Sequence, residues 1–211
     1  FHRDPGITPR TFYERYVGLD LDAYAGVMNL PTSDKPYGRT YRTAYLPTVH
    51  GGTERPYLNI DAETMSSLAL RQVLAGEGVY FSCDVVQMMD REAGILDDAL
   101  YDLEGVLGVP FHLSKPDRLG YGGAIEGSHV MLLAGVHVVD GAPVRWKVEN
   151  SWGEEHGKKG YFVMSDGWFR NYALGIVVRK EYLSADLRAA LEEPPTVLPP
   201  WDPMQYVASV R

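Results

Sequence analysis

Apolar and polar positions along the chain predict an α+β protein whose second half is dominated by strands. Residues 61–74 show apolar side chains at helical spacing, with Asp61 placed to cap the helix and two glycines placed to end it. Residues 79–85 follow as an apolar run typical of a buried strand. Residues 86–120 mix short apolar pieces with glycines, so we expect loops there with one or two helical turns.

The second half of the chain shows the pattern of an antiparallel sheet. Residues 130–139 are largely apolar, and Asp140-Gly141 is a dipeptide typical of a hairpin turn. Residues 144–149 return with apolar and charged side chains alternating, so one face of this strand should be buried. Two further strands, separated by a short helix, are predicted over 160–164 and 174–179. Short connections of this kind favour an antiparallel sheet that curls or closes into a barrel.

Composition along the chain suggests three parts. Residues 1–60 are rich in Pro, Gly and Tyr, with a short helix expected after Thr8 and a second helical piece over 20–28. We therefore expect a helical, loop-rich lead-in. Residues 61–193 carry the predicted helix and the barrel-like antiparallel sheet. Residues 194–211 are Pro-rich and are expected to form an extended arm.

Overall composition excludes several classes of protein. The 211 residues are 45% hydrophobic and 23% charged, which is typical of one large globular domain or two small ones. The longest uncharged apolar runs reach about ten residues, against the roughly 20 that a membrane-spanning helix needs. The net charge of −8 comes without a cluster of Lys and Arg, which argues against a nucleic-acid partner.

The single cysteine, Cys83, excludes a disulfide within the chain and fits a reducing compartment. Five histidines lack the spacing of metal ligands, so we expect no metal and no other cofactor; they are His2, His50, His112, His137 and His156.

The sixth histidine, His129, opens one strand of the predicted hairpin, and Asn150 ends the other strand. In an antiparallel hairpin these two ends meet. An imidazole beside an amide oxygen is a base held in one orientation, and such a pair normally serves a nucleophile. A core histidine and an unrelated turn asparagine are the alternative. The sequence Ser151-Trp152-Gly153 directly after Asn150 favours the interpretation of His129 as a base oriented by Asn150.

Several segments resemble known peptidases. Three resemble the carboxy-terminal part of papain-like cysteine peptidases: Ser128-His129-Val130-Met131, Val148-Glu149-Asn150-Ser151-Trp152-Gly153 and Gly160-Tyr161-Phe162-Val163-Met164-Ser165-Asp166. Four resemble the bleomycin hydrolase and aminopeptidase C family more narrowly: Asp34-Lys35-Pro36-Tyr37, Phe81-Ser82-Cys83-Asp84-Val85, Leu100-Tyr101-Asp102 and Leu198-Pro199-Pro200-Trp201-Asp202-Pro203-Met204. The resemblance extends from about residue 7 to residue 204.

This resemblance implies a papain-like cysteine peptidase fold, of which the chain would be the carboxy-terminal portion. It implies that His129 is the catalytic histidine, that Asn150 orients it, and that Trp152 shields their hydrogen bond from water. The implied activity is that of a thiol protease, an aminopeptidase acting on peptides with a free amino terminus. The family further implies a cytoplasmic homo-oligomer, a hexamer with the active sites facing a central chamber.

The chain also departs from the family pattern. The nucleophilic cysteine of the family lies in an amino-terminal block that these residues do not contain, and Cys83 matches a non-catalytic position. Because the sequence begins at Phe1, we expect it to be the carboxy-terminal half of an enzyme whose Cys-bearing half is a partner. The alternative is a non-catalytic barrel module or an inactive fragment. Seven residues follow Met204, a longer ending than the family usually shows.

Overall fold

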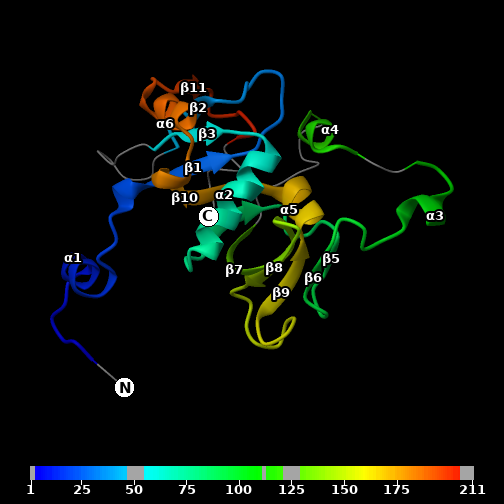
Figure 1. Cartoon of the computed structure of the whole chain (residues 1–211), viewed down its shortest axis with the longest axis horizontal. Coiled ribbons are helices and arrows are strands. Elements are labelled where there is room, and N and C mark those ends of the chain that lie inside the picture. The colour runs from blue at the N-terminus through cyan, green and yellow to red at the C-terminus, as the bar shows by residue number, and fades with distance from the viewer. Residues whose placement is uncertain (1–2, 47–54, 111–112, 121–128, 205–211) are drawn as a thin grey trace.

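The computed structural model describes residues 3–46, 55–110, 113–120 and 129–204 (Figure 1). Its α-helices are α1 (Pro9–Phe12), α2 (Ala62–Leu74), α3 (Leu103–Leu107), α4 (Lys115–Gly120), α5 (Asp166–Tyr172) and α6 (Ala185–Glu192). It also has a π-helical turn, η1 (Tyr13–Val17), and two 3-10 turns, η2 (Leu21–Ala23) and η3 (Lys180–Tyr182). Its strands are β1 (Tyr24–Met28), β2 (Arg39–Thr43), β3 (Tyr57–Asn59), β4 (Val79–Cys83), β5 (Met89–Asp90), β6 (Ile95–Leu96), β7 (His129–Val139), β8 (Ala142–Glu149), β9 (Tyr161–Ser165), β10 (Ala173–Arg179) and β11 (Thr196–Leu198). None of the helices in these described ranges is long and apolar enough to cross a membrane.

All eleven strands belong to one open sheet, in the order β11-β2-β3-β1-β10-β4-β7-β8-β9-β6-β5. The expected closure into a barrel is therefore wrong, because within the described residues the two end strands pair only inward. The pairs β1–β3, β11–β2 and β6–β9 are parallel and the others antiparallel, which makes the sheet mixed. Strands β1, β2 and β3 of the predicted lead-in and β11 of the predicted arm form one side of this sheet.

The predicted lead-in is built into this sheet. The helical piece expected over 20–28 is only the single turn η2, and β1 follows it. In β1, Ala25 and Val27 are buried at alternate positions, the period of a strand. Gly26 faces Tyr57 of β3, where a Cβ atom would lie 2.9 Å from the Tyr57 ring. The close approach of β3 therefore requires a glycine at this position.

The short strands β2, β3, β5 and β6 lie in segments that were expected to be loops, whereas the elements predicted after residue 60 form where the sequence pattern places them. The predicted helix over 61–74 is α2, and the Asp61 carboxylate accepts the backbone N–H of Thr64 at 2.7 Å. The predicted hairpin is β7–β8, and its turn residues Asp140 and Gly141 both have positive φ, as a tight hairpin turn requires. Residues 205–211 of the predicted arm lie outside the described residues, and its first part contributes β11.

The main hydrophobic core lies between the sheet and helices α2 and α5, which cover one of its faces (Figure 1). Its largest fully buried side chains include Phe81, Trp146, Phe162, Trp168 and Phe169. A second, smaller cluster joins the arm to the sheet and consists of Met28, Leu30, Tyr41, Leu174, Leu198 and Met204. The sheet is therefore packed on both faces near β1, because Val27 and Met28 point to opposite sides of the strand.

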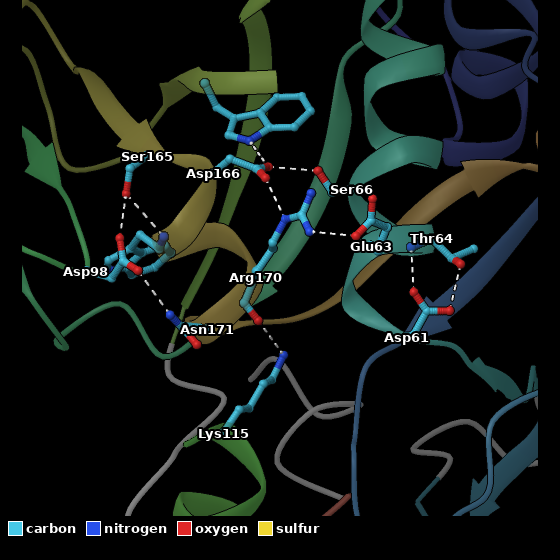
Figure 2. A network of polar contacts seen from close by, with 12 residues as sticks. Asp61, Glu63, Thr64, Ser66, Asp98, Lys115, Ser165, Asp166, Arg170 and Asn171 are labelled. Atoms are coloured by element: carbon cyan, nitrogen blue, oxygen red, sulfur yellow. Dashed lines mark hydrogen bonds and ion pairs between the residues drawn. The ribbon is translucent and has the colours of Figure 1, made fainter. Parts of the chain in front are cut away.

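A network of polar contacts joins α2, α5 and β8 across this core (Figure 2). The Asp166 carboxylate accepts hydrogen bonds from the Ser66 hydroxyl at 2.7 Å and from Trp146 Nε1 at 3.0 Å. Its other oxygen accepts from Arg170 Nε at 2.6 Å, and Arg170 also reaches Glu63 at 3.1 Å. One buried carboxylate thus fixes both helices against the strand that ends next to Asn150.

Candidate active site

The hairpin β7–β8 brings His129 and Asn150 together, as the sequence predicts. His129 opens β7, and Asn150 directly follows β8, in which Glu149 pairs with Leu132. The distance from His129 Nε2 to Asn150 Oδ1 is 2.8 Å, which confirms that the two side chains lie within hydrogen-bond reach. An amide oxygen only accepts hydrogen bonds, so Nε2 carries the proton and donates it. In the neutral ring Nδ1 is then unprotonated and can accept a proton.

Trp152 lies directly against the imidazole. The two ring centroids are 4.7 Å apart and the planes are inclined by 23°, which is a stacked arrangement. The indole is half-buried and also packs edge-on against Phe162, at 6.0 Å between centroids. The indole therefore covers one face of the imidazole, and its role as a shield of the His129–Asn150 hydrogen bond stays a prediction.

The loop that carries Trp152 is closed by backbone hydrogen bonds at its base. The N–H of Asn150 donates to the carbonyl of Gly160 at 3.0 Å, and the Asn150 side-chain oxygen also accepts the N–H of Ser151 at 2.8 Å. The second bond joins the Asn150 side chain to the backbone of the next residue. The amide that faces His129 is thereby held by local structure before any partner binds.

Cys83 lies beside the site in the sheet but is not exposed to it. It pairs with His129 across β4 and β7, and its Sγ contacts the His129 carbonyl oxygen at 3.8 Å. The residue is fully buried, which confirms the prediction of a buried strand thiol. Burial raises the pKa of the Cys83 thiol well above its ordinary value, and the charge of Asp84 raises it further. A fully buried thiol with a raised pKa is a poor nucleophile.

Two residues at the site were missed by sequence reasoning. Arg91, between β5 and β6, places its guanidinium carbon 4.7 Å from the Trp152 ring centroid, and its Nη2 lies 3.0 Å from His156 Nε2. Nothing local in the sequence connects Arg91 to the site. The sequence showed only that His156 lacks the spacing of a metal ligand, and it gave no link between His156 and the site.

The remaining predictions on histidines concern metal binding. His2, His50 and His112 lie outside the described residues, and His137 is exposed on β7. Among the residues that the structure describes, no group of three or more His, Cys, Asp or Glu side chains could hold a metal ion.

A buried lysine near α5 is a further feature that the sequence did not indicate. Lys115 Nζ donates to Asn29 Oδ1 at 2.7 Å and to the carbonyl oxygens of Ala173 at 2.5 Å and Arg170 at 3.3 Å (Figure 2 shows its contact with Arg170). Burial, together with a smaller effect of the neighbouring charge of Arg118, lowers the pKa of Lys115 to about 7. All three of these acceptors are neutral oxygens.

Comparison with known proteins places this geometry in a family. The model of the Peptidase C1-like family matches residues 1–205. Aminopeptidase C of Streptococcus thermophilus is 45% identical over 210 residues, which are 99% of this chain and 47% of the relative. Aminopeptidase C of Lactococcus lactis subsp. cremoris is 48% identical over 202 residues, which are 95% of this chain and 46% of the relative.

A solved structure supports the same assignment. The crystal structure of PepW from Lactobacillus rhamnosis HN001 superposes with a TM-score of 0.91 at 46% identity, covering 96% of this chain and 46% of that one. The chain thus spans about half the length of the relatives it matches. The fold is the mixed α/β, papain-like fold that the sequence resemblance implied, and the chain belongs to the Peptidase C1-like family.

Proposed function

We propose that the chain is the His/Asn-bearing part of a cysteine aminopeptidase that removes amino-terminal residues from peptides. The observation that carries this proposal is the 2.8 Å contact between His129 Nε2 and Asn150 Oδ1, with Trp152 stacked on the imidazole. The substrate class is supported by the relatives, which are named aminopeptidase C and cover nearly all of this chain.

In the proposed mechanism His129 acts as a base and then as an acid. Its Nδ1 takes the proton of a cysteine thiol, while the Nε2–H bond to Asn150 fixes the orientation of the ring. The resulting thiolate attacks the carbonyl carbon of the amino-terminal peptide bond. The imidazolium then protonates the leaving amine, and a water molecule activated by the neutral imidazole releases the acyl group from sulfur.

The nucleophile in this proposal comes from outside the 211 residues. Cys83 is the single cysteine of the sequence, and it is buried with a raised pKa. We therefore assign the nucleophilic thiol to an amino-terminal, Cys-bearing segment that acts as the partner of this chain. By the family resemblance we also propose a cytoplasmic homo-oligomer, a hexamer.

The test compares the chain alone with the chain combined with the Cys-bearing segment, either in one polypeptide or in trans. Hydrolysis of a leucyl-aminomethylcoumarin reporter is measured for both, with intact mass recorded for each preparation. We expect activity only in the combined protein. His129→Ala should lower kcat by about 10³-fold or more, because the nucleophile and its base act as a unit and the loss of one member removes most of the rate acceleration of both. His137→Ala, an exposed histidine on the same strand, is the matched control and should retain full activity.

Two results would overturn the proposal. One is hydrolysis by the 211-residue chain alone, with mass confirming its length. The other is a combined protein that hydrolyses aminoacyl reporters equally well with His129→Ala. A combined protein that hydrolyses none of them would favour the alternative, a non-catalytic module.

A further inference from the structure

The outer part of the site is formed by a turn that is distant in sequence. Arg91 lies between the short strands β5 and β6, and its guanidinium carbon is 4.7 Å from the centroid of the Trp152 ring. The same indole lies 4.7 Å from the His129 imidazole. Trp152 therefore contacts a permanent cation as well as the proposed catalytic base.

A hydrogen bond holds Arg91 in this position. Its Nη2 lies 3.0 Å from His156 Nε2, and because a guanidinium only donates, the histidine nitrogen must be the acceptor. His156 follows Trp152 in the same loop and packs edge-on against the indole, at 6.4 Å between centroids and 89° between planes. Arg91 thus contacts the Trp152 loop twice, once through the ring and once through His156.

The backbone around Arg91 is packed tightly against the same loop. Gly94 and Gly157 both have positive φ, and a Cβ atom on Gly94 would lie 2.5 Å from the Cα of Gly157. The turn is closed by the Asp90 carboxylate, which accepts the N–H of Ala93 at 2.9 Å. The carbonyl of Gly94 accepts the N–H of Val163 at 2.8 Å, which ties the turn to β9. The place of Arg91 is therefore set by close backbone packing.

We propose that Arg91 is a positioning residue of this peptidase, acting through Trp152 to hold the indole over the His129–Asn150 hydrogen bond. The inference rests on the proposed function. Trp152 is only half-buried, and a cation over its ring adds an attraction that resists its rotation into solvent. With the indole in place, the hydrogen bond lies in a medium of lower polarity, where it is stronger and orients the base better.

The first experiment measures kcat and KM of Arg91→Ala and Arg91→Lys in the combined protein. A cation–π contact at a partly exposed site corresponds to roughly a 2–5-fold change, and the lost His156 bond adds to it, so Arg91→Ala should lower kcat by about 3–10-fold. KM should change less than about twofold, since Arg91 acts on the base. Arg91→Lys keeps the cation and should recover part of the loss. Arg188→Ala, an exposed arginine on α6, is the matched control.

The second experiment separates positioning from general stability. If Arg91 acts through the indole, Arg91→Ala should have almost no further effect in a Trp152→Leu background, where the two losses would not add. His156→Ala should lower kcat in the same direction as Arg91→Ala. Unfolding midpoints of all variants identify any loss of kcat that merely follows loss of fold.

The inference is overturned if Arg91→Ala keeps the kcat of the unmodified protein. It is also overturned if the loss of kcat in the double variant equals the product of the losses caused by Arg91→Ala and Trp152→Leu separately. His129→Ala in the same series separates this failure from failure of the proposed function. If His129→Ala is inactive while Arg91→Ala is unaffected, only the role of Arg91 is wrong. If His129→Ala remains active, the proposed function itself fails.

Discussion

Asp166 is the residue whose replacement tests the packing of the fold most directly. Its carboxylate accepts the Ser66 hydroxyl and the Trp146 N–H, and both donors belong to residues that are 1% exposed. The change Asp166→Ala removes the acceptor for both. A buried donor without an acceptor costs about 1–3 kcal/mol, so the two groups together predict a loss of about 2–6 kcal/mol.

The lost ion pair with Arg170 adds little to this figure. The Arg170 side chain is 36% exposed and retains Glu63 as a partner at 3.1 Å. Partly exposed pairs of this kind contribute about 0–1 kcal/mol. We therefore expect Asp166→Ala to lower the free energy of unfolding chiefly through the orphaned donors. Asp166→Asn keeps an oxygen acceptor for both donors and should cost only about 1 kcal/mol.

Urea unfolding followed by tryptophan fluorescence measures both variants, because Trp146 itself lies in the network. The slope of free energy against urea should remain the same, so that the midpoint reports stability. Asp186→Ala is the matched control, since Asp186 occupies the first turn of α6 but is exposed. Equal losses for Asp166→Ala and Asp166→Asn, or a loss below about 1 kcal/mol for the alanine variant, would refute the reasoning.

Three other predictions concern a buried base, a buried thiol and a close glycine contact. The pKa of Lys115 is lowered to about 7 in the fold, so the cost of burying its charge is complete below that pH and is relieved as the pH rises. The free energy of unfolding should therefore increase between about pH 7 and 9.5, by up to roughly 1.4 kcal/mol per pH unit. If Lys115→Met showed the same dependence of stability on pH, this reasoning would be contradicted. Cys83 should react with a disulfide reagent such as Ellman's only on unfolding, and Cys83→Ala should retain peptidase activity; fast labelling of the folded protein with loss of activity would argue for a catalytic role. Gly94→Ala should destabilise the protein by about 1–3 kcal/mol more than Gly108→Ala in urea unfolding, because both have positive φ but only the first would clash with Gly157.

The geometry of the candidate site was predictable because it is local. Asp140-Gly141 fixes the turn of one hairpin, and the start of β7 and the end of β8 then meet whatever the rest of the chain does. His129 and Asn150 lie at those two points. The Ser-Trp-Gly sequence adds the indole within two residues. No long-range pairing needed to be known to bring these three side chains together.

The remaining parts of the fold depend on pairings between distant segments, which local patterns do not specify. Tyr24–Met28 is short enough to fit a helix or a strand, and it becomes β1 because β3 and β10 flank it. β11 joins β2 in parallel through the same kind of distant pairing. Arg91 escaped notice for this reason too, since its contact with Trp152 exists only once β6 has paired with β9.

The position of β10 within the sheet sets an order on folding during synthesis. β10 lies between β1 and β4, yet it comes after both β7 and β8 along the chain. A nascent chain that has left the ribosome only as far as residue 172 can therefore form two separate groups of strands, each with an unpaired inner edge. The insertion of Ala173–Arg179 joins them in one late step of high sequence separation. Until that step, the edges of β1 and β4 are open to pairing with other chains, and the insertion of β10 removes these two sites of aggregation.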